Sequence, residues 1–144
     1  MPNALSFNLH LLTSRMDRLA DRLLQVELGV SYSRFMALFM IDLLKSTSQR
    51  ALAEKLGVTE PSVSRMTAAL VDAKLVKVCR DPAGGNRRSL DLSLEGKQLV
   101  QRCTRILEQE FVKIVKTSGV PLAEYLRHTK LLVACLDDFE GAAK

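Results

Sequence analysis

Apolar residues recur at helical spacing along most of the chain, and residues that cap or break helices lie at the two ends of these runs. Over residues 3–27 the steps between apolar positions alternate between four and three, as in a helix packed lengthwise on other helices. Asn3 is a suitable cap for this helix, and Gly29 breaks it. Because the helix is long for so small a chain, part of its apolar seam is expected to contact another subunit. The seam consists of Leu5, Leu9, Leu12, Met16, Leu19, Leu23 and Val26.

A second helix is predicted to run to about Lys45 from Ser31 or Ser33, either of which can cap it. Met36 and Met40 lie within it as flexible side chains that fill gaps in the core. Its other core positions are Phe35, Leu38, Phe39, Ile41, Leu43 and Leu44. The polar segment 46–48 is expected to form a loop or a minimal edge strand.

Residues 49–73 carry the pattern of two short helices joined by a tight turn. The first ends at Gly57, which can adopt the left-handed conformation that stops a helix. Thr59 can cap the second, and Pro61 in its first turn costs no hydrogen bond because the N–H groups there have no helical partner. The apolar positions of the second helix share one face, with Thr67 predicted to lie off it; they are Val63, Met66, Ala69, Leu70 and Ala73. This pattern indicates a helix-turn-helix.

Two strands joined by a basic loop are predicted directly after this motif. Residues 75–79 are rich in β-branched side chains, and residues 89–94 alternate strictly between polar and apolar. Between them Pro82 and the pair Gly84 and Gly85 are typical of a hairpin tip. A phosphate-cradling glycine loop is the competing interpretation, but no GxxxxGK motif and no directly following helix support it. The segment therefore indicates a wing.

Two further helices complete the predicted fold, one from about Glu95 to about Thr117 and one from Pro121 onwards. The predicted class is mainly α with a small β-hairpin wing: a winged helix-turn-helix flanked by long dimerisation helices. A chain of 144 residues that is 47% apolar is expected to form a single domain, residues 1–144. Within it, residues 31–94 are predicted to form the winged helix-turn-helix, and residues 1–28 and 96–144 the helices that flank it.

Charge and cysteine content narrow the function classes. The net charge of +5 and the sequence pI near 9.3 favour an anionic partner. Five bases against one acid lie just after the helix-turn-helix, at Lys74, Lys77, Arg80, Arg87 and Arg88. Three cysteines without a CxxC pair fit a reducing compartment, and each is expected to be a small core residue. With no leader peptide and no apolar run near the roughly 18 residues of a membrane span, a cytoplasmic protein without a membrane partner is expected.

The order of elements and several motifs resemble the MarR family of bacterial winged-helix transcription regulators. The helix-turn-helix signature of the family resembles residues 52–65, LAEKLGVTEPSVSR, and its wing signature resembles Arg80 through Arg88 to the alternating leucines and Gly96. The resemblance covers essentially the whole chain. Two positions depart from the pattern: Asn86 stands where the family has Asp, which weakens an expected charged brace, and Lys74 stands where the family favours glycine. The helix before Lys74 is therefore expected to end without the easy left-handed turn of a glycine.

The resemblance implies a sequence-specific regulator, a repressor, that binds double-stranded DNA as a homodimer at an inverted-repeat operator. It also implies that residues 31–94 are the DNA-binding region and that residues 1–28 and 96–144 are the helical dimerisation region. Arg65 is a candidate for bidentate binding to guanine in the major groove, with phosphate binding or pairing with an acid as the alternatives. Arg87 and Arg88 on the wing are candidates for the minor groove. The full set of candidate DNA-binding residues is Thr59, Glu60, Pro61, Ser62, Ser64, Arg65, Lys74, Arg87 and Arg88.

Similar regulators release DNA when a small aromatic or anionic molecule binds, or when cysteines oxidise. The candidate ligand-binding residues are His10, Arg15, Met36 and Met40, and Cys103 is the remaining candidate redox sensor. An enzyme is disfavoured, because the only histidines, His10 and His128, lie far apart on separate helices, and no metal-ligand cluster and no Ser or Cys nucleophile with a placed base appears. No cofactor is expected. The alternative function is a winged-helix module that binds proteins without sequence-specific DNA binding.

Overall fold

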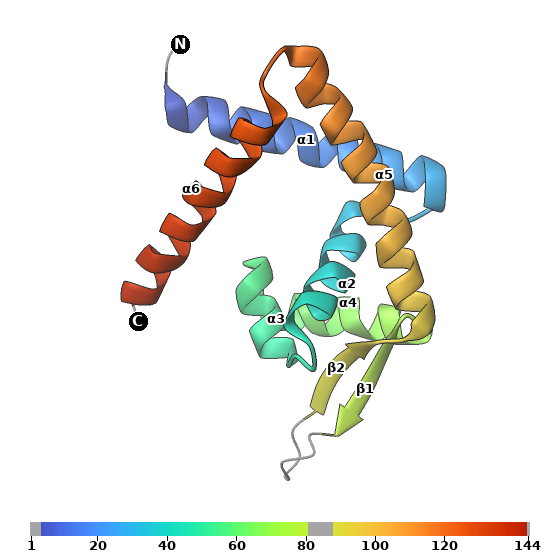
Figure 1. The fold of residues 1–144 in the computed structure, drawn as a ribbon. Coiled ribbons are helices and arrows are strands. Elements are labelled where there is room, and N and C mark those ends of the chain that lie inside the picture. The colour runs from blue at the N-terminus through green and yellow to red at the C-terminus, as the bar shows by residue number, and fades with distance from the viewer. Residues whose placement is uncertain (1–3, 81–87, 144) are drawn as a thin grey trace. The chain divides into compact units, whose positions relative to one another are not determined.

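The chain folds into six helices and a two-stranded antiparallel wing over the residues described, 4–80 and 88–143, in the computed structural model (Figure 1). The predicted fold class is therefore confirmed. In chain order the elements are α1 (Leu5–Leu28), α2 (Tyr32–Leu44), α3 (Gln49–Leu56), α4 (Glu60–Asp72), β1 (Val76–Arg80), β2 (Arg88–Leu92), α5 (Leu94–Ser118) and α6 (Leu122–Ala142). Two compact units divide within α5, one of residues 1–106 and one of residues 107–144. No described helix is long and apolar enough to cross a membrane.

Helix boundaries follow the side chains that can cap them. Ser31, Ser48 and Thr59 each accept a hydrogen bond from the backbone N–H three residues later, at 3.2, 3.1 and 3.3 Å. Gly29 and Gly57 end α1 and α3 in the left-handed region, with φ of 64° and 66°. The predicted cap Asn3 lies outside the described residues; α1 starts after Ala4, which makes no side-chain cap.

The core of the first unit gathers side chains from all of its elements. The buried apolar residues there are Ala20, Leu24, Phe35, Ala37, Leu38, Ile41, Leu52, Ala53, Val63, Leu70, Val76, Leu90, Leu92, Val100 and Cys103. Thr67 is also buried, which corrects its predicted place off the core face of α4. The reason is its spacing, because Val63, Thr67 and Leu70 are separated by four and three residues and so share one side of the helix.

The wing is a hairpin with a minimal third strand. β1 and β2 pair antiparallel, with Val76 opposite Leu92 and Arg80 opposite Arg88. Thr47 forms an isolated bridge with Leu90, so the segment 46–48 is the minimal edge strand that the sequence left as one of two options. The predicted alternation of residues 89–94 ends early, because Leu94 begins α5 and is exposed.

A compact joint ties the end of α4 to the start of α5. The Ser93 hydroxyl donates to the backbone carbonyl of Lys74 at 2.7 Å and accepts from the N–H of Gly96 at 3.0 Å. The N–H of Ser93 also donates to the carbonyl of Leu75 at 3.0 Å. Lys74 has a φ of 59°, so the chain turns in the left-handed region although no glycine is present. The expectation that α4 ends without this turn is wrong, because the hydrogen bonds of the joint hold the lysine in it.

Much of the apolar surface of α1 is exposed within the single chain. The buried side chains of α1 are Ala20 and Leu24, whereas Leu5 and Val26 of the predicted seam are 73% and 83% exposed. In the second unit, α6 has no buried residue. Its large exposed apolar residues are Tyr125, Leu126, Leu131, Leu132, Val133, Leu136 and Phe139.

Candidate nucleic-acid interface

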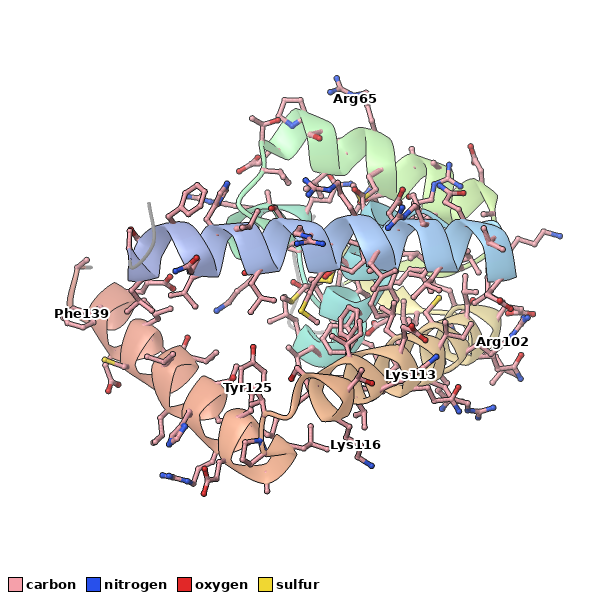
Figure 2. The ribbon with its side chains drawn as sticks, turned by 90° about the horizontal axis from the view of Figure 1, so that it is seen from above. Arg65, Arg102, Lys113, Lys116, Tyr125 and Phe139 are labelled. Carbon is pink, nitrogen blue, oxygen red and sulfur yellow. The ribbon has the colours of Figure 1, made fainter. Side chains whose placement is uncertain are left out.

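The polar side of α4 presents the predicted base-reading residues. Val63, Thr67 and Leu70 are buried on one side of this helix, which leaves Ser64 and Arg65 exposed on the other. Arg65 extends away from the helix (Figure 2), and no acid of the described chain forms an ion pair with it. Pairing with an acid, one of its alternative roles, is therefore not what the structure shows.

The residues at the first turn of α4 are exposed, and they also stabilise the start of the helix. Thr59 caps the helix through the N–H of Ser62, and Pro61 occupies the first turn without displacing a hydrogen bond. Glu60 lies where the helix dipole favours an acid, and its carboxylate is 4.0 Å from the guanidinium of Arg50 on α3. Both side chains of that pair are largely exposed, so the pair adds little stability.

The register of the wing sets two arginines side by side. Arg80 ends β1 and Arg88 begins β2, and the two are direct partners in the hairpin with both side chains exposed. Like charges placed opposite each other repel, and an anion between them relieves that repulsion. The sequence identified Arg88 as a candidate but counted Arg80 only as part of the basic region, because strand register is not visible in composition. Arg87 and Asn86 lie outside the described residues.

Lys74 adds a cation directly after the C-terminal end of α4. Because α4 carries the predicted base-reading residues, it is called the reader helix below. Its side chain is exposed directly after α4, and its backbone is held by Ser93 of the joint. Within residues 4–80 and 88–106, the first unit thus carries exposed cations on α4, after α4 and at the wing that form no ion pair there. This arrangement suits a phosphate backbone flanking a groove.

The predicted effector residues differ in exposure, and one of them lines a hollow of α1. His10 is exposed, and Met36 and Met40 are half-buried. Arg15 lines a hollow, but its other lining residues are Arg18 and Arg22 of the same helix. The apolar environment of α2 includes the tilted ring pairs Tyr32–Phe35 and Phe35–Phe39, with centroids 6.2 and 5.8 Å apart.

The three cysteines differ in exposure, which corrects the expectation that all are core residues. Cys103 is buried, whereas Cys79 and Cys135 are exposed. Burial raises the pKa of the Cys103 thiol, and the nearby charge of Arg102 only partly opposes that rise. A buried thiol with a raised pKa forms little thiolate, the reactive species, so Cys103 is poorly suited to sensing oxidants.

We expect Cys79 to be alkylated by iodoacetamide in the native protein and Cys103 to react only after denaturation. Peptide mapping by mass spectrometry at successive times measures both rates in one sample, and Cys103 should lag by at least about tenfold. Equal native rates would contradict the buried placement of Cys103.

Among the described residues no group of three His, Cys, Asp or Glu side chains is placed to hold a metal ion.

Comparison with known proteins finds a family model that matches part of the chain and solved structures that share its fold. Residues 28–86 match the model of the MarR family. The fold is similar to wild-type MarR of E. coli in its apo form, with a TM-score of 0.80, 20% identity, and coverage of 94% of this chain and 98% of that one. None of the curated proteins matches the chain.

Two similar structures contain DNA. One is the S. aureus MepR–DNA complex, with a TM-score of 0.73, 21% identity, and coverage of 94% of this chain and 96% of that one. The other is a mutant E. coli MarR complexed with operator DNA, with a TM-score of 0.74, 21% identity, and coverage of 92% and 93%. At this level of identity the likeness shows a shared fold.

Proposed function

We propose, from the premise that this chain belongs to the MarR family of winged helix-turn-helix transcription regulators, that it is a repressor that binds an inverted-repeat operator as a homodimer. Regulators of this family are not enzymes. The observation that carries the proposal is the set of exposed cations on α4 and the wing that form no ion pair with another described residue, with Arg65 on α4 and Arg88 at the hairpin. Support comes also from E. coli MarR and S. aureus MepR, which share the fold and were solved with DNA.

Two observations support dimerisation: the small number of bases that α4 alone can contact, and the exposed apolar residues. One reader helix contacts too few bases for strong specificity, and two of them about 34–36 Å apart would face successive major grooves. The proposed dimerisation region, residues 1–28 and 96–144, contains the exposed apolar side chains of α1 and α6. Exposed apolar surface on this scale marks an interaction site.

The most direct test is a footprint or a selection on genomic fragments that include the region upstream of the chain's own gene. We expect a protected inverted repeat, occupied by a dimer, with affinity that falls steeply as salt rises because phosphate contacts release counterions. Weak binding without sequence preference or salt dependence would favour the protein-interaction module instead. A screen of small aromatic and anionic molecules for release of the DNA complex then tests the proposed effector; His10, Arg15, Met36 and Met40 stay candidates for its site.

We expect Arg88→Ala to weaken binding to specific and random duplexes alike and to make the salt dependence shallower. Each lost phosphate contact lowers the slope of log K against log salt by about 0.9, so a dimer that loses one on each wing lowers it by about 2. Fluorescence anisotropy between roughly 50 and 200 mM salt measures the slope. Arg80→Ala, its strand partner, is expected to do the same, and an unchanged slope in both variants would contradict a wing contact.

Two substitutions at Lys74 separate stability from DNA binding. Lys74→Gly should raise the free energy of unfolding by up to about 1 kcal/mol, because the left-handed conformation costs a lysine about 1–2 kcal/mol and the greater freedom of unfolded glycine offsets part of that gain. Lys74→Ala keeps the strained conformation while it removes the same charge. Urea denaturation distinguishes the two variants, whereas anisotropy should show the same loss of DNA affinity in both. A DNA affinity equal to wild type in both would remove Lys74 from the interface.

A further inference from the structure

The charged residues of α1 are sorted by sign around the helix, although they alternate in sequence. Asp21 accepts a hydrogen bond from the backbone N–H of Tyr32 at 2.9 Å, at the start of α2. Asp17 also acts on Tyr32: the pKa of the tyrosine hydroxyl is raised, first by burial and then by the charge of Asp17 and a hydrogen bond with it. Both acids of this part of α1 are therefore directed at α2.

The arginines that alternate with these acids in sequence lie on another side of the helix. Arg15, Arg18 and Arg22 are three and four residues apart, which places their side chains in one row on α1. They line a hollow of about 250 Å³. No acid of the described chain forms an ion pair with any of the three, and all three are exposed. We call these residues the α1 arginine row.

Three neighbouring guanidinium groups without counter-charges repel one another, so the row gains most from an anion that contacts several of them together. The guanidinium group is planar, permanently charged and suited to binding phosphate or carboxylate oxygens in pairs. The hollow is somewhat smaller than the roughly 300–1,000 Å³ typical of drug-sized ligands. Its size and lining thus favour a small, multiply charged anion over an aromatic molecule.

We propose that the α1 arginine row is a binding site for a small anion that carries two or more phosphate or carboxylate groups. The site belongs to one helix of the first unit and needs no DNA. Arg15 is also one of the candidate effector residues, whereas Met36 and Met40 do not line this hollow. Phosphate and carboxylate ligands share the chemistry that the row recognises, so the test compares the two.

The test uses the full-length protein without DNA, titrated with sodium pyrophosphate or with citrate at an ionic strength held constant with sodium chloride. Isothermal titration calorimetry gives the affinity, and the shift of Tm gives an independent measure, because a ligand of the folded state alone stabilises it. We expect wild type to bind at least one of the two anions. Arg18→Gln should lower that affinity at least about tenfold, with Arg15→Gln and Arg22→Gln showing the same direction.

Arg102→Gln is the matched control, because it removes the same charge from an exposed position on α5 that does not line the hollow. It should bind the anion as wild type does. Without anion, Arg18→Gln should have a Tm equal to or above that of wild type, since it relieves repulsion within the row. This result also shows that the variant folds, so a lost response to pyrophosphate reports on the site.

Three outcomes would overturn the proposal. Pyrophosphate and citrate could both bind wild type no better than chloride does. Arg18→Gln and Arg102→Gln could lose the same fraction of affinity, which would indicate a general effect of net charge. Arg18→Gln could leave anion binding intact and lower DNA affinity, which would place a DNA phosphate at the row instead. Failure of DNA binding alone would leave the anion measurements unaffected, so the two proposals fail separately.

Discussion

Gly96→Ala is expected to lower the free energy of unfolding by about 3 kcal/mol, at the upper end of the usual cost of overpacking. A Cβ at this position would lie closer to the backbone carbonyl oxygen of Leu75 than real Cβ atoms approach any heavy atom. The clash cannot be relieved by a rotamer change, because the atom it meets belongs to the backbone. That carbonyl also accepts the N–H of Ser93, so moving it breaks the joint between α4 and α5.

Thermal unfolding followed by circular dichroism measures this effect, and the Tm of Gly96→Ala should fall by about 10 °C. Gly141→Ala is the matched control, since the added Cβ would meet no atom within 4 Å and Gly141 also lies in a helix. Its Tm should stay the same or rise, because alanine favours helix over glycine by about 1 kcal/mol. Equal Tm values for Gly96→Ala and wild type would show that the joint is not as close as the structure has it.

The sequence predicts the fold well where single residues determine the local chain direction. Gly57 stops a helix by its own conformational freedom, and Ser31 and Thr59 cap helices with hydroxyl groups three residues before the N–H that they bind. Each of these signals acts over a few residues and needs no tertiary contact. The order of helices and wing follows from their succession, and the confirmed MarR resemblance rests on the same positions.

Features that depend on contacts across the chain are not visible in the sequence. Lys74 takes a left-handed turn that its residue type disfavours, because Ser93 binds its carbonyl from nineteen residues away. Arg80 meets Arg88 only through the hairpin register. In both cases the residue type is visible in the sequence, but tertiary structure determines which residue it contacts.

The charged residues of α1 give another example, because tertiary contacts determine which of them are left to form the candidate anion site. In sequence, Arg15, Asp17, Arg18, Asp21 and Arg22 form a mixed polar face whose charges would be expected to neutralise one another. In the structure the acids are engaged by Tyr32, and the arginines are left as a row of one sign. Which of the two arrangements forms depends on the contacts of α2 with α1. Periodicity places the three arginines in one row, but it cannot show whether the acids pair with them or with Tyr32.

Arg65→Ala is expected to have the largest effect on specificity. A bidentate contact from arginine to guanine is worth about 1–3 kcal/mol of discrimination, and a homodimer loses it at both half-sites. The ratio of operator affinity to random-duplex affinity should therefore fall by a factor of about 30 or more. Competition binding with duplexes of equal length measures that ratio, and the stability of the variant should be unchanged because Arg65 is exposed and forms no ion pair in the described chain.

Arg65→Lys separates base reading from phosphate binding. Lysine keeps the charge but lacks the planar fork that binds two guanine atoms at once, so it should retain affinity for random DNA while the affinity ratio falls nearly as far as in Arg65→Ala. If Arg65 contacts only phosphate, the lysine variant should behave as wild type, and the alanine variant should lose affinity equally for all sequences. That second pattern would assign specificity to Ser62, Ser64 or the wing and would leave Arg65 as a positioning contact.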